Sequence, residues 1–297
     1  MHPNPLIVGL GEVLWDVFPD GPRFGGAPAN FVCSAAGLAR GRFEVAIASA
    51  VGVDELGQRA IAALVDHHVN IDAVARINYP TGQVNVRLDN QGHASYEFAM
   101  DTAWDRLGWS NGLKELALRA DVVCFGTLGQ RSHQSQATIR RFVGATRSST
   151  LRVLDINLRP PFYTDAIILD SIKLASVLKL NDEELPVLAR LTDLTGSPID
   201  MLRQLAKRYE LQVVALTLGA NGAILMQGDE VSQCPGVETR VVDTVGAGDA
   251  YTAALVIGLL NGRNLETINR TACEVAAYVC SQSGATPLLP DWLSEAL

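Results

Sequence analysis

Two glycines and an acid lie together near the C-terminus, in the run Asp-Thr-Val-Gly-Ala-Gly-Asp at residues 243–249. The β-branched residues 239–242 predict the end of a strand, and the apolar residues 251–260 predict a buried helix. A helix start binds anions through its free N–H groups and the positive end of its dipole, and glycine lets the backbone approach the anion closely. Asp249 can therefore cap the helix or accept a proton beside a bound anion. The second role is the chemistry of phosphoryl transfer to a hydroxyl.

A second glycine pair lies near the N-terminus, in the run Gly-Gly-Ala-Pro-Ala-Asn at residues 25–30. Gly25 and Gly26 precede a predicted helix, so their backbone can approach a ligand closely. Asn30 offers both a donor and an acceptor, and Asp16 can accept two hydroxyl hydrogen bonds. These residue types fit the hydroxyl groups of a sugar, whereas the alternative for Asp16 is an acid in a turn.

Composition limits the classes of partner. The 297-residue chain is 48% hydrophobic and 19% charged, which allows a sizeable core and argues against disorder. Its net charge is −8, so we expect no nucleic-acid partner, because phosphate backbones need a basic surface. The sequence shows no signal peptide and no stretch of membrane-spanning length, and its five cysteines form no close pairs. We therefore expect a cytoplasmic protein without membrane association.

Short apolar runs alternate with longer amphipathic segments along the chain. This alternation predicts an α/β fold with a central, mostly parallel sheet and helices on both faces. The strands are expected at residues 6–11, 45–51, 121–126, 151–157, 177–181 and 211–217. Helices are expected at residues 29–40, 54–67 and 132–146, from about Asp182 and from Pro198. We expect residues 1–297 to form a single domain, with ligands outside the carboxyl ends of the strands.

Two segments depart from this alternation. Residues 81–99 alternate polar and apolar side chains around a polar turn at residues 89–92, which predicts an antiparallel hairpin. Residues 13–24 predict a second hairpin of the same kind. We expect these segments, about residues 12–25 and 80–100, to form a lid over a site or the surface of a homodimer. The alternative is an ordinary extension of the sheet edge.

With both glycine motifs in view, essentially the whole chain resembles the ribokinase-like, PfkB-type family of carbohydrate kinases. The run ending in Asp249 is similar to the most specific signature of that family, and residues 25–30 are similar to its N-terminal signature. Residues 11–16, 25–30 and 280–287 are most similar to bacterial fructokinases. The resemblance implies transfer of the γ-phosphoryl group of ATP to a sugar hydroxyl, with fructose as the sugar.

The resemblance also implies a role for each matching residue. Asp249 would take the proton from the attacking hydroxyl, beside an anion hole formed by the amides of Gly246, Ala247, Gly248 and Asp249 itself. That role agrees with the chemistry, because phosphoryl transfer depends mostly on positioning and electrostatic stabilisation. The residues implied to hold the sugar are Asp16, Gly25, Gly26, Asn30, Gln130 and Arg159.

The implied nucleotide and metal sites involve further residues. Asn181 and Glu184 would position Mg²⁺ through water and the ATP phosphates, although an N-cap at an acidic helix start is the alternative. Thr217 and Gly219 would contact ATP, although a glycine turn leading into a hairpin explains them equally well. Many family members bind K⁺ beside the anion hole, and the matching positions here are Asp243, Val245, Gln282 and Gly284.

Several alternatives stay open at this point. Within the family, the acceptor could be 2-keto-3-deoxygluconate, with Arg159 or Arg87 meeting its carboxylate, or ribose, or a nucleoside stacked on Trp15 or Phe98. A sugar or nucleotide sensor would keep the fold without turnover, but the intact Asp249 argues against it. A Rossmann oxidoreductase is disfavoured, because residues 9–14 lack the third glycine of its fingerprint.

Overall fold

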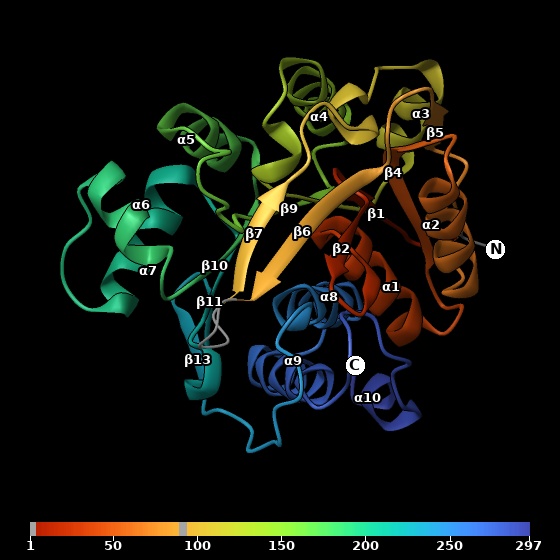
Figure 1. The fold of residues 1–297 in the computed structure, drawn as a ribbon. Helices are drawn as coiled ribbons and strands as arrows, with labels where there is room; N and C mark the ends of the chain where they lie inside the picture. The colour runs from red at the N-terminus through yellow and green to blue at the C-terminus, as the bar shows by residue number, and fades with distance from the viewer. Residues whose placement is uncertain (1–3, 89–93) are drawn as a thin grey trace.

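The computed structural model describes residues 4–88 and 94–297 and is built around a nine-stranded sheet (Figure 1). The strand order is β13-β12-β11-β10-β9-β8-β1-β4-β5. The parallel strands are β1 (Leu6–Leu10), β4 (Glu44–Gly52), β5 (Val74–Ile77), β8 (Val122–Phe125), β9 (Leu151–Asp155), β10 (Val177–Asn181) and β11 (Val213–Thr217). An antiparallel edge follows, made by β12 (Ala223–Gln227) and β13 (Glu230–Cys234). The predicted mostly parallel sheet is confirmed.

Helices cover both faces because consecutive residues of the strands point to opposite sides. On the side of Ile7 the cover consists of α1 (Ala27–Ala39), α2 (Glu55–Asp66), α8 (Ala247–Leu260) and α9 (Leu265–Cys280). On the side of Val8 it consists of α3 (Asn111–Arg119), α4 (His133–Ala145), α5 (Asp165–Leu174), α6 (Leu185–Thr192) and α7 (Pro198–Tyr209). The short α10 (Asp291–Glu295) ends the chain. Because α8 is apolar nearly all round, it is the buried inner helix of its layer.

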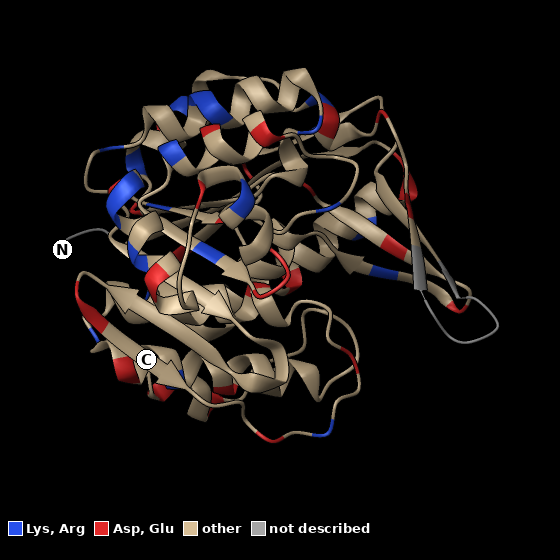
Figure 2. Ribbon diagram, turned by 90° about the vertical axis from the view of Figure 1, so that its left-hand side faces the viewer, with Lys and Arg blue, Asp and Glu red and all other residues tan. Residues whose placement is uncertain are grey.

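A separate four-stranded sheet has the order β3-β2-β6-β7. Both predicted hairpins are confirmed: β2 (Leu14–Phe18) pairs antiparallel with β3 (Gly21–Gly25), and β6 (Gly82–Leu88) with β7 (Ala94–Phe98). The two hairpins then join through a parallel pairing of β2 with β6. The β6–β7 pair projects from the body of the molecule (Figure 2). The predicted polar turn at residues 89–92 lies outside the described residues.

Opposite faces of this small sheet have different surroundings. Trp15 packs edge-on against Phe24, lies under the guanidinium of Arg59, and donates from Nε1 to the carbonyl of Leu56 in α2. Its neighbour Asp16 therefore points the other way, toward the carboxyl ends of the parallel strands. The small sheet is thus fixed to the body by one face and offers the other face to the site.

A buried ion pair fixes the end of β7. Arg131 donates to the Asp105 carboxylate and to the carbonyl of Ala99, and both charged side chains are almost fully buried. The Arg131 guanidinium also lies over the rings of Trp104 and Phe162. These contacts anchor the base of the β6–β7 pair to the body.

Two sequence-based predictions of local structure were wrong or displaced. Residues 239–242 form no strand: Val241 and Val242 are 60% and 56% exposed, and the Val242 amide donates to the carbonyl of Cys280. Their β-branched side chains have no core face to cover, so strand propensity alone does not decide their structure. The helix expected from about Asp182 begins at Leu185 instead, after a hydrogen-bonded turn.

Among the described residues, no helix has the length and apolar character needed to cross a bilayer.

Candidate active site

The start of α8 is built to receive an anion. Gly246 precedes the helix with a φ of 79°, a conformation that favours glycine. Its neighbour Ala247 donates weakly to the Thr244 carbonyl at 3.4 Å. Within the described part of the chain, the amides of Gly248 and Asp249 have no hydrogen-bond acceptor. Two free N–H groups at the positive end of a helix dipole form the electrostatic core of an anion site.

Asp249 connects this helix start to the N-terminal glycine motif. Its Oδ2 accepts a hydrogen bond from Asn30 Nδ2 at 2.9 Å, across 219 residues of sequence. Burial, followed by the charge of Asp155, raises the pKa of Asp249 to about 7, against the opposing effects of Asn30, Lys179 and Arg159. A carboxylate with a pKa near neutrality can both accept and release a proton. It lies in a small pocket with Ala27, Pro28, Phe31, Cys124, Phe125, Gly126 and Asp155.

The side chain of Asp16 and the two N-terminal glycines lie beside this pocket. A Cβ atom on Gly25 would lie 3.0 Å from Asp16 Oδ2, and one on Gly26 would lie 2.7 Å from the Glu12 carbonyl. Burial raises the pKa of Asp16 to about 6, while the Arg159 charge opposes this rise. The charge of Arg159 also lowers the pKa values of Glu12 and Asp249. The structure thus gathers acids and the Asn30 amide around Asp249, within the electrostatic influence of the Arg159 cation.

Gln130 is the predicted sugar ligand that the structure does not bring to this site. Its side chain is 1% exposed. Its Nε2 donates to the Gly126 carbonyl and to Ser171 Oγ in α5, and its Oε1 accepts from Arg140. Because these contacts satisfy the amide and direct it into the α4–α5 layer, we assign Gln130 no role in sugar binding.

A second cluster lies where β10 and β11 end side by side. Asn181 pairs in register with Thr217, and Gly219 follows in a short 3-10 turn with a φ of 55°. Asn181 Oδ1 accepts from the Glu184 amide, while the two oxygens of Glu184 accept from the amides of Asn181 and Leu158. This reciprocal turn precedes α6 and does not cap it, because the N-cap of α6 is Glu184 and has no side-chain cap; the turn fixes the amide and carboxylate oxygens at the edge of the sheet.

Comparison with known proteins decides the family. Residues 21–292 match the pfkB family of carbohydrate kinases. This chain belongs to that family. It is 29% identical to a putative sugar kinase of Pyrococcus horikoshii, over 94% of this chain and 91% of the relative. The crystal structure of that relative with ATP has a TM-score of 0.80, covering 98% of this chain and 100% of that one.

Two other relatives carry fructokinase names. A probable chloroplastic fructokinase of Arabidopsis thaliana is 30% identical over 97% of this chain and 80% of the relative. A fructokinase of Escherichia coli is 28% identical over 95% of each chain. The chain is therefore a sugar kinase of the pfkB family, with the ribokinase-like fold.

The charge balance of this pfkB kinase site fits a divalent cation. Lys179 is buried among Asp155, Glu184 and Asp249. Burial lowers the pKa of Lys179, but the three carboxylates together raise it by a larger amount, so the net effect is a raised pKa. Three acids thus share one ammonium. The described residues contain no cluster of three or more His, Cys, Asp or Glu that could hold a metal alone. Asn181 and Glu184 offer oxygen groups, the chemistry that a hydrated Mg²⁺ bound mainly by nucleotide phosphates would need.

Three of the four residues matched to a K⁺ site are close together. Asp243 Oδ1 accepts from the Val245 amide at 3.0 Å, and its Oδ2 accepts from the Gly284 amide at 3.3 Å. Arg23 approaches the same carboxylate at 3.8 Å. Gln282 lies in the same turn after α9 and donates to Ser281 Oγ. Asp243 therefore connects the loop before α8 with the loop after α9, beside the anion site.

Sequence reasoning missed two buried charged residues of this site, Lys179 and Glu12. Lys179 occupies the middle of an apolar strand, a pattern that could have drawn attention to it. Glu12 is 2% exposed, and its Oε2 has no partner within the described chain. Burial raises the pKa of Glu12 to about 7. A Cβ atom on Gly26 would lie 2.7 Å from the Glu12 carbonyl oxygen, and one on Gly129 would lie 3.2 Å from Glu12 Oε2, so Glu12 lies against both glycines.

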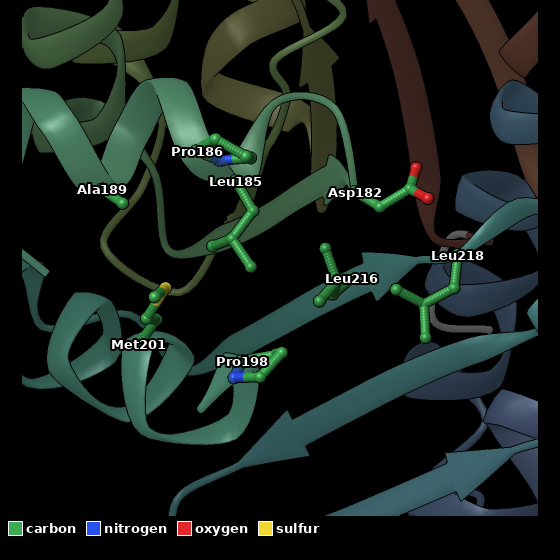
Figure 3. A pocket seen from close by; sticks show the side chains of 8 residues that line it. All are labelled: Asp182, Leu185, Pro186, Ala189, Pro198, Met201, Leu216 and Leu218. Carbon is green, nitrogen blue, oxygen red and sulfur yellow. The ribbon is translucent and has the colours of Figure 1, made fainter. Parts of the chain in front are cut away.

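A larger pocket of about 390 Å³ lies elsewhere, between α6, α7 and the end of β11 (Figure 3). Its walls are apolar apart from Asp182, and they belong to the face of the sheet opposite α8. It shares no lining residue with the pocket that contains Asp249, so it is separate from the start of α8. It is lined by Asp182, Leu185, Pro186, Ala189, Pro198, Met201, Leu216 and Leu218.

Proposed function

We propose that this protein transfers the γ-phosphoryl group of ATP to a hydroxyl of fructose. One observation carries the proposal: Asp249, whose pKa is about 7, is held by Asn30 beside the two free amides of the α8 start. This arrangement places a proton acceptor next to an anion site. The fructokinase names of two relatives support fructose as the acceptor.

In the proposed reaction, Asp249 accepts the proton of the attacking sugar hydroxyl. That oxygen forms a bond to the γ-phosphorus while the bond from this phosphorus to the bridging oxygen of ADP breaks, and the electron pair leaves with ADP. The amides of Gly248 and Asp249 stabilise the charge of the phosphoryl group. Asp16 and Asn30 orient the sugar, and Gly25 and Gly26 keep the backbone close to it.

The nucleotide is proposed to lie along the ends of β10 and β11, in contact with Thr217 and Gly219. Asn181 and Glu184 would hold the water shell of Mg²⁺, which when bound neutralises phosphate charge. Asp243, Val245, Gln282 and Gly284 would surround K⁺. The small sheet is proposed as the lid of a single-domain enzyme and as a surface for homodimer formation.

The structure weighs against a nucleoside acceptor. The Trp15 ring is 6% exposed and packs against Phe24 and Arg59, so it is not available to a base. Phe98 is already packed edge-on against Phe162 at a centroid distance of 5.1 Å. An acceptor without a base therefore fits the site better.

A second candidate acceptor is 2-keto-3-deoxygluconate, because the exposed Arg159 acts electrostatically on both Asp16 and Asp249 and could bind a carboxylate. The side chain of Arg87, the other cation considered from the sequence, lies outside what the structure describes.

A panel of acceptors with ATP tests the proposal. We expect the highest kcat/KM with fructose, exceeding that of ribose, adenosine and 2-keto-3-deoxygluconate by about 10²-fold or more. A preference for 2-keto-3-deoxygluconate that disappears in Arg159→Met would favour the second candidate. No phosphorylated product from any acceptor would indicate a sensor instead.

The pKa of Asp249 predicts how the rate depends on pH. Only the ionised carboxylate can accept the hydroxyl proton, and burial holds its pKa at about 7. We therefore expect kcat to rise as pH increases through about 7 and to level off above it. Initial rates between pH 5.5 and 9 would show this, and a kcat already constant down to pH 5.5 would contradict the assignment.

A further inference from the structure

Lys179 is a buried cation that joins three elements beneath the anion site. It lies in β10, and its Nζ is 3.1 Å from Asp155 Oδ1 at the end of β9. Both side chains are only 7% exposed. On the other side, the hydroxyl of Thr252 in α8 lies 3.0 Å from both Asp155 Oδ2 and the Gly248 carbonyl. The pair is therefore connected directly to the first turn of α8.

Gly248 shows how close the ammonium comes to that turn. A Cβ atom built on Gly248 would lie 2.9 Å from Lys179 Nζ. Among the described residues, and apart from its chain neighbours and the backbone of the helix itself, Lys179 Cε is the only further atom within 4 Å of this position. The ammonium therefore fills the space that a side chain at position 248 would occupy. It therefore lies beside the residue that carries one of the free amides.

The place of this charge is unusual. The start of a helix is its positive dipole end, where a cation is unfavourable and an anion is favourable. A buried ion pair also contributes little net stability compared with apolar packing. The buried acids Asp155, Glu184 and Asp249 favour a cation here, and the same charge would add to the field that a phosphoryl group meets.

We infer that Lys179 is a positioning residue for phosphoryl transfer: its ammonium, held by Asp155, supports the Gly248 backbone and strengthens the anion site from behind. This inference rests on the proposed function. In this role Lys179 acts through Gly248: its ammonium occupies the space beside the Gly248 Cα, and Thr252 Oγ1 lies 3.0 Å from the Gly248 carbonyl.

The competing explanation is that Lys179 only neutralises the buried Asp155. Two variants separate these roles. Lys179→Met leaves Asp155 unpaired, whereas the double variant Lys179→Met/Asp155→Asn removes both charges. If neutralisation is the only role, the double variant should regain both thermal stability and activity. If Lys179 positions the turn, the double variant should regain stability alone.

The test measures Tm, kcat and KM for the wild type, the two variants and a control, Lys173→Met. Lys173 is an exposed lysine that also pairs with an acid, Asp170 at 3.3 Å, far from α8 in the chain. We expect the double variant to keep the wild-type Tm within a few degrees but to lose about 10²-fold in kcat, with KM values little changed. Wild-type kcat in the double variant would overturn the inference.

Hydrogen exchange separates failure of this inference from failure of the proposed function, because the measurement needs no sugar substrate. In the ligand-free proteins, we expect the first turn of α8, where the Ala250 amide donates to the Gly246 carbonyl, to exchange several-fold faster in both variants than in the wild type or Lys173→Met. Unchanged exchange in the double variant would also overturn the inference. If the wild type phosphorylates no sugar in the panel, the proposed function fails, while the exchange result still decides the role of Lys179.

Discussion

Replacing Asp249 with asparagine is expected to lower kcat by about 10²–10⁴-fold, the usual contribution of a general base. Asparagine keeps the size of the side chain and can still accept the hydrogen bond that Asn30 donates at 2.9 Å. It cannot take a proton from the sugar hydroxyl. Because the sugar contacts of Asp16 and Asn30 are separate from this step, the Kd of the sugar should change little. Steady-state kinetics and calorimetric sugar titration measure the two effects.

The stability of Asp249→Asn supplies the control. The folded protein raises the pKa of this carboxyl from 3.8 to about 7, so its ionisation disfavours the folded state increasingly between these pH values. The variant should therefore be at least as stable as the wild type at pH 8. Loss of activity together with a lower Tm at pH 8 would indicate a folding defect, and near-normal kcat would refute the role of Asp249 as base.

Replacing Gly246 with alanine is expected to reduce kcat by about 10²–10³-fold, the effect of losing an oxyanion donor. The residue has a φ of 79°, and its new Cβ would lie 2.5 Å from the Ala285 carbonyl oxygen. The backbone must therefore shift, and the amides of Gly248 and Asp249 shift with it. Since these amides act on the phosphoryl group, kcat should fall much more than the affinity for the sugar.

Gly262→Ala is a matched control for this prediction. Gly262 follows the other end of α8 with a similar positive φ of 63°, but a Cβ there would meet no atom within 4 Å. This variant carries similar backbone strain without a collision and should keep the wild-type kcat. Equal losses of kcat in the two variants would mean that general destabilisation, not the geometry of the anion site, causes the effect.

Local patterns in the sequence predicted much of this fold. Six of the parallel strands, several helices and both hairpins follow from periodicity and turn residues, because hydrophobic burial acts over a few neighbouring residues. Strand β5 and the helices α3 and α5 were not predicted. The helix start at Gly246 was also predicted from the sequence, since free amides and a left-handed glycine depend only on local chain geometry. Residues 239–242 show the limit, because β-branched residues form a strand only where a partner and a core face exist.

Tertiary structure alone decided how these parts meet. The parallel pairing of β2 with β6 and the contact between Asn30 and Asp249 join distant segments, and no local pattern encodes such distances. The direction of a side chain is likewise set by its neighbours: Gln130 turns into the α4–α5 layer, while Lys179 lies behind Gly248. The sequence by itself therefore determined the chemical groups and the elements that carry them. Packing determined which groups share the site, because burial and hydrogen bonding are satisfied only when the whole chain is assembled.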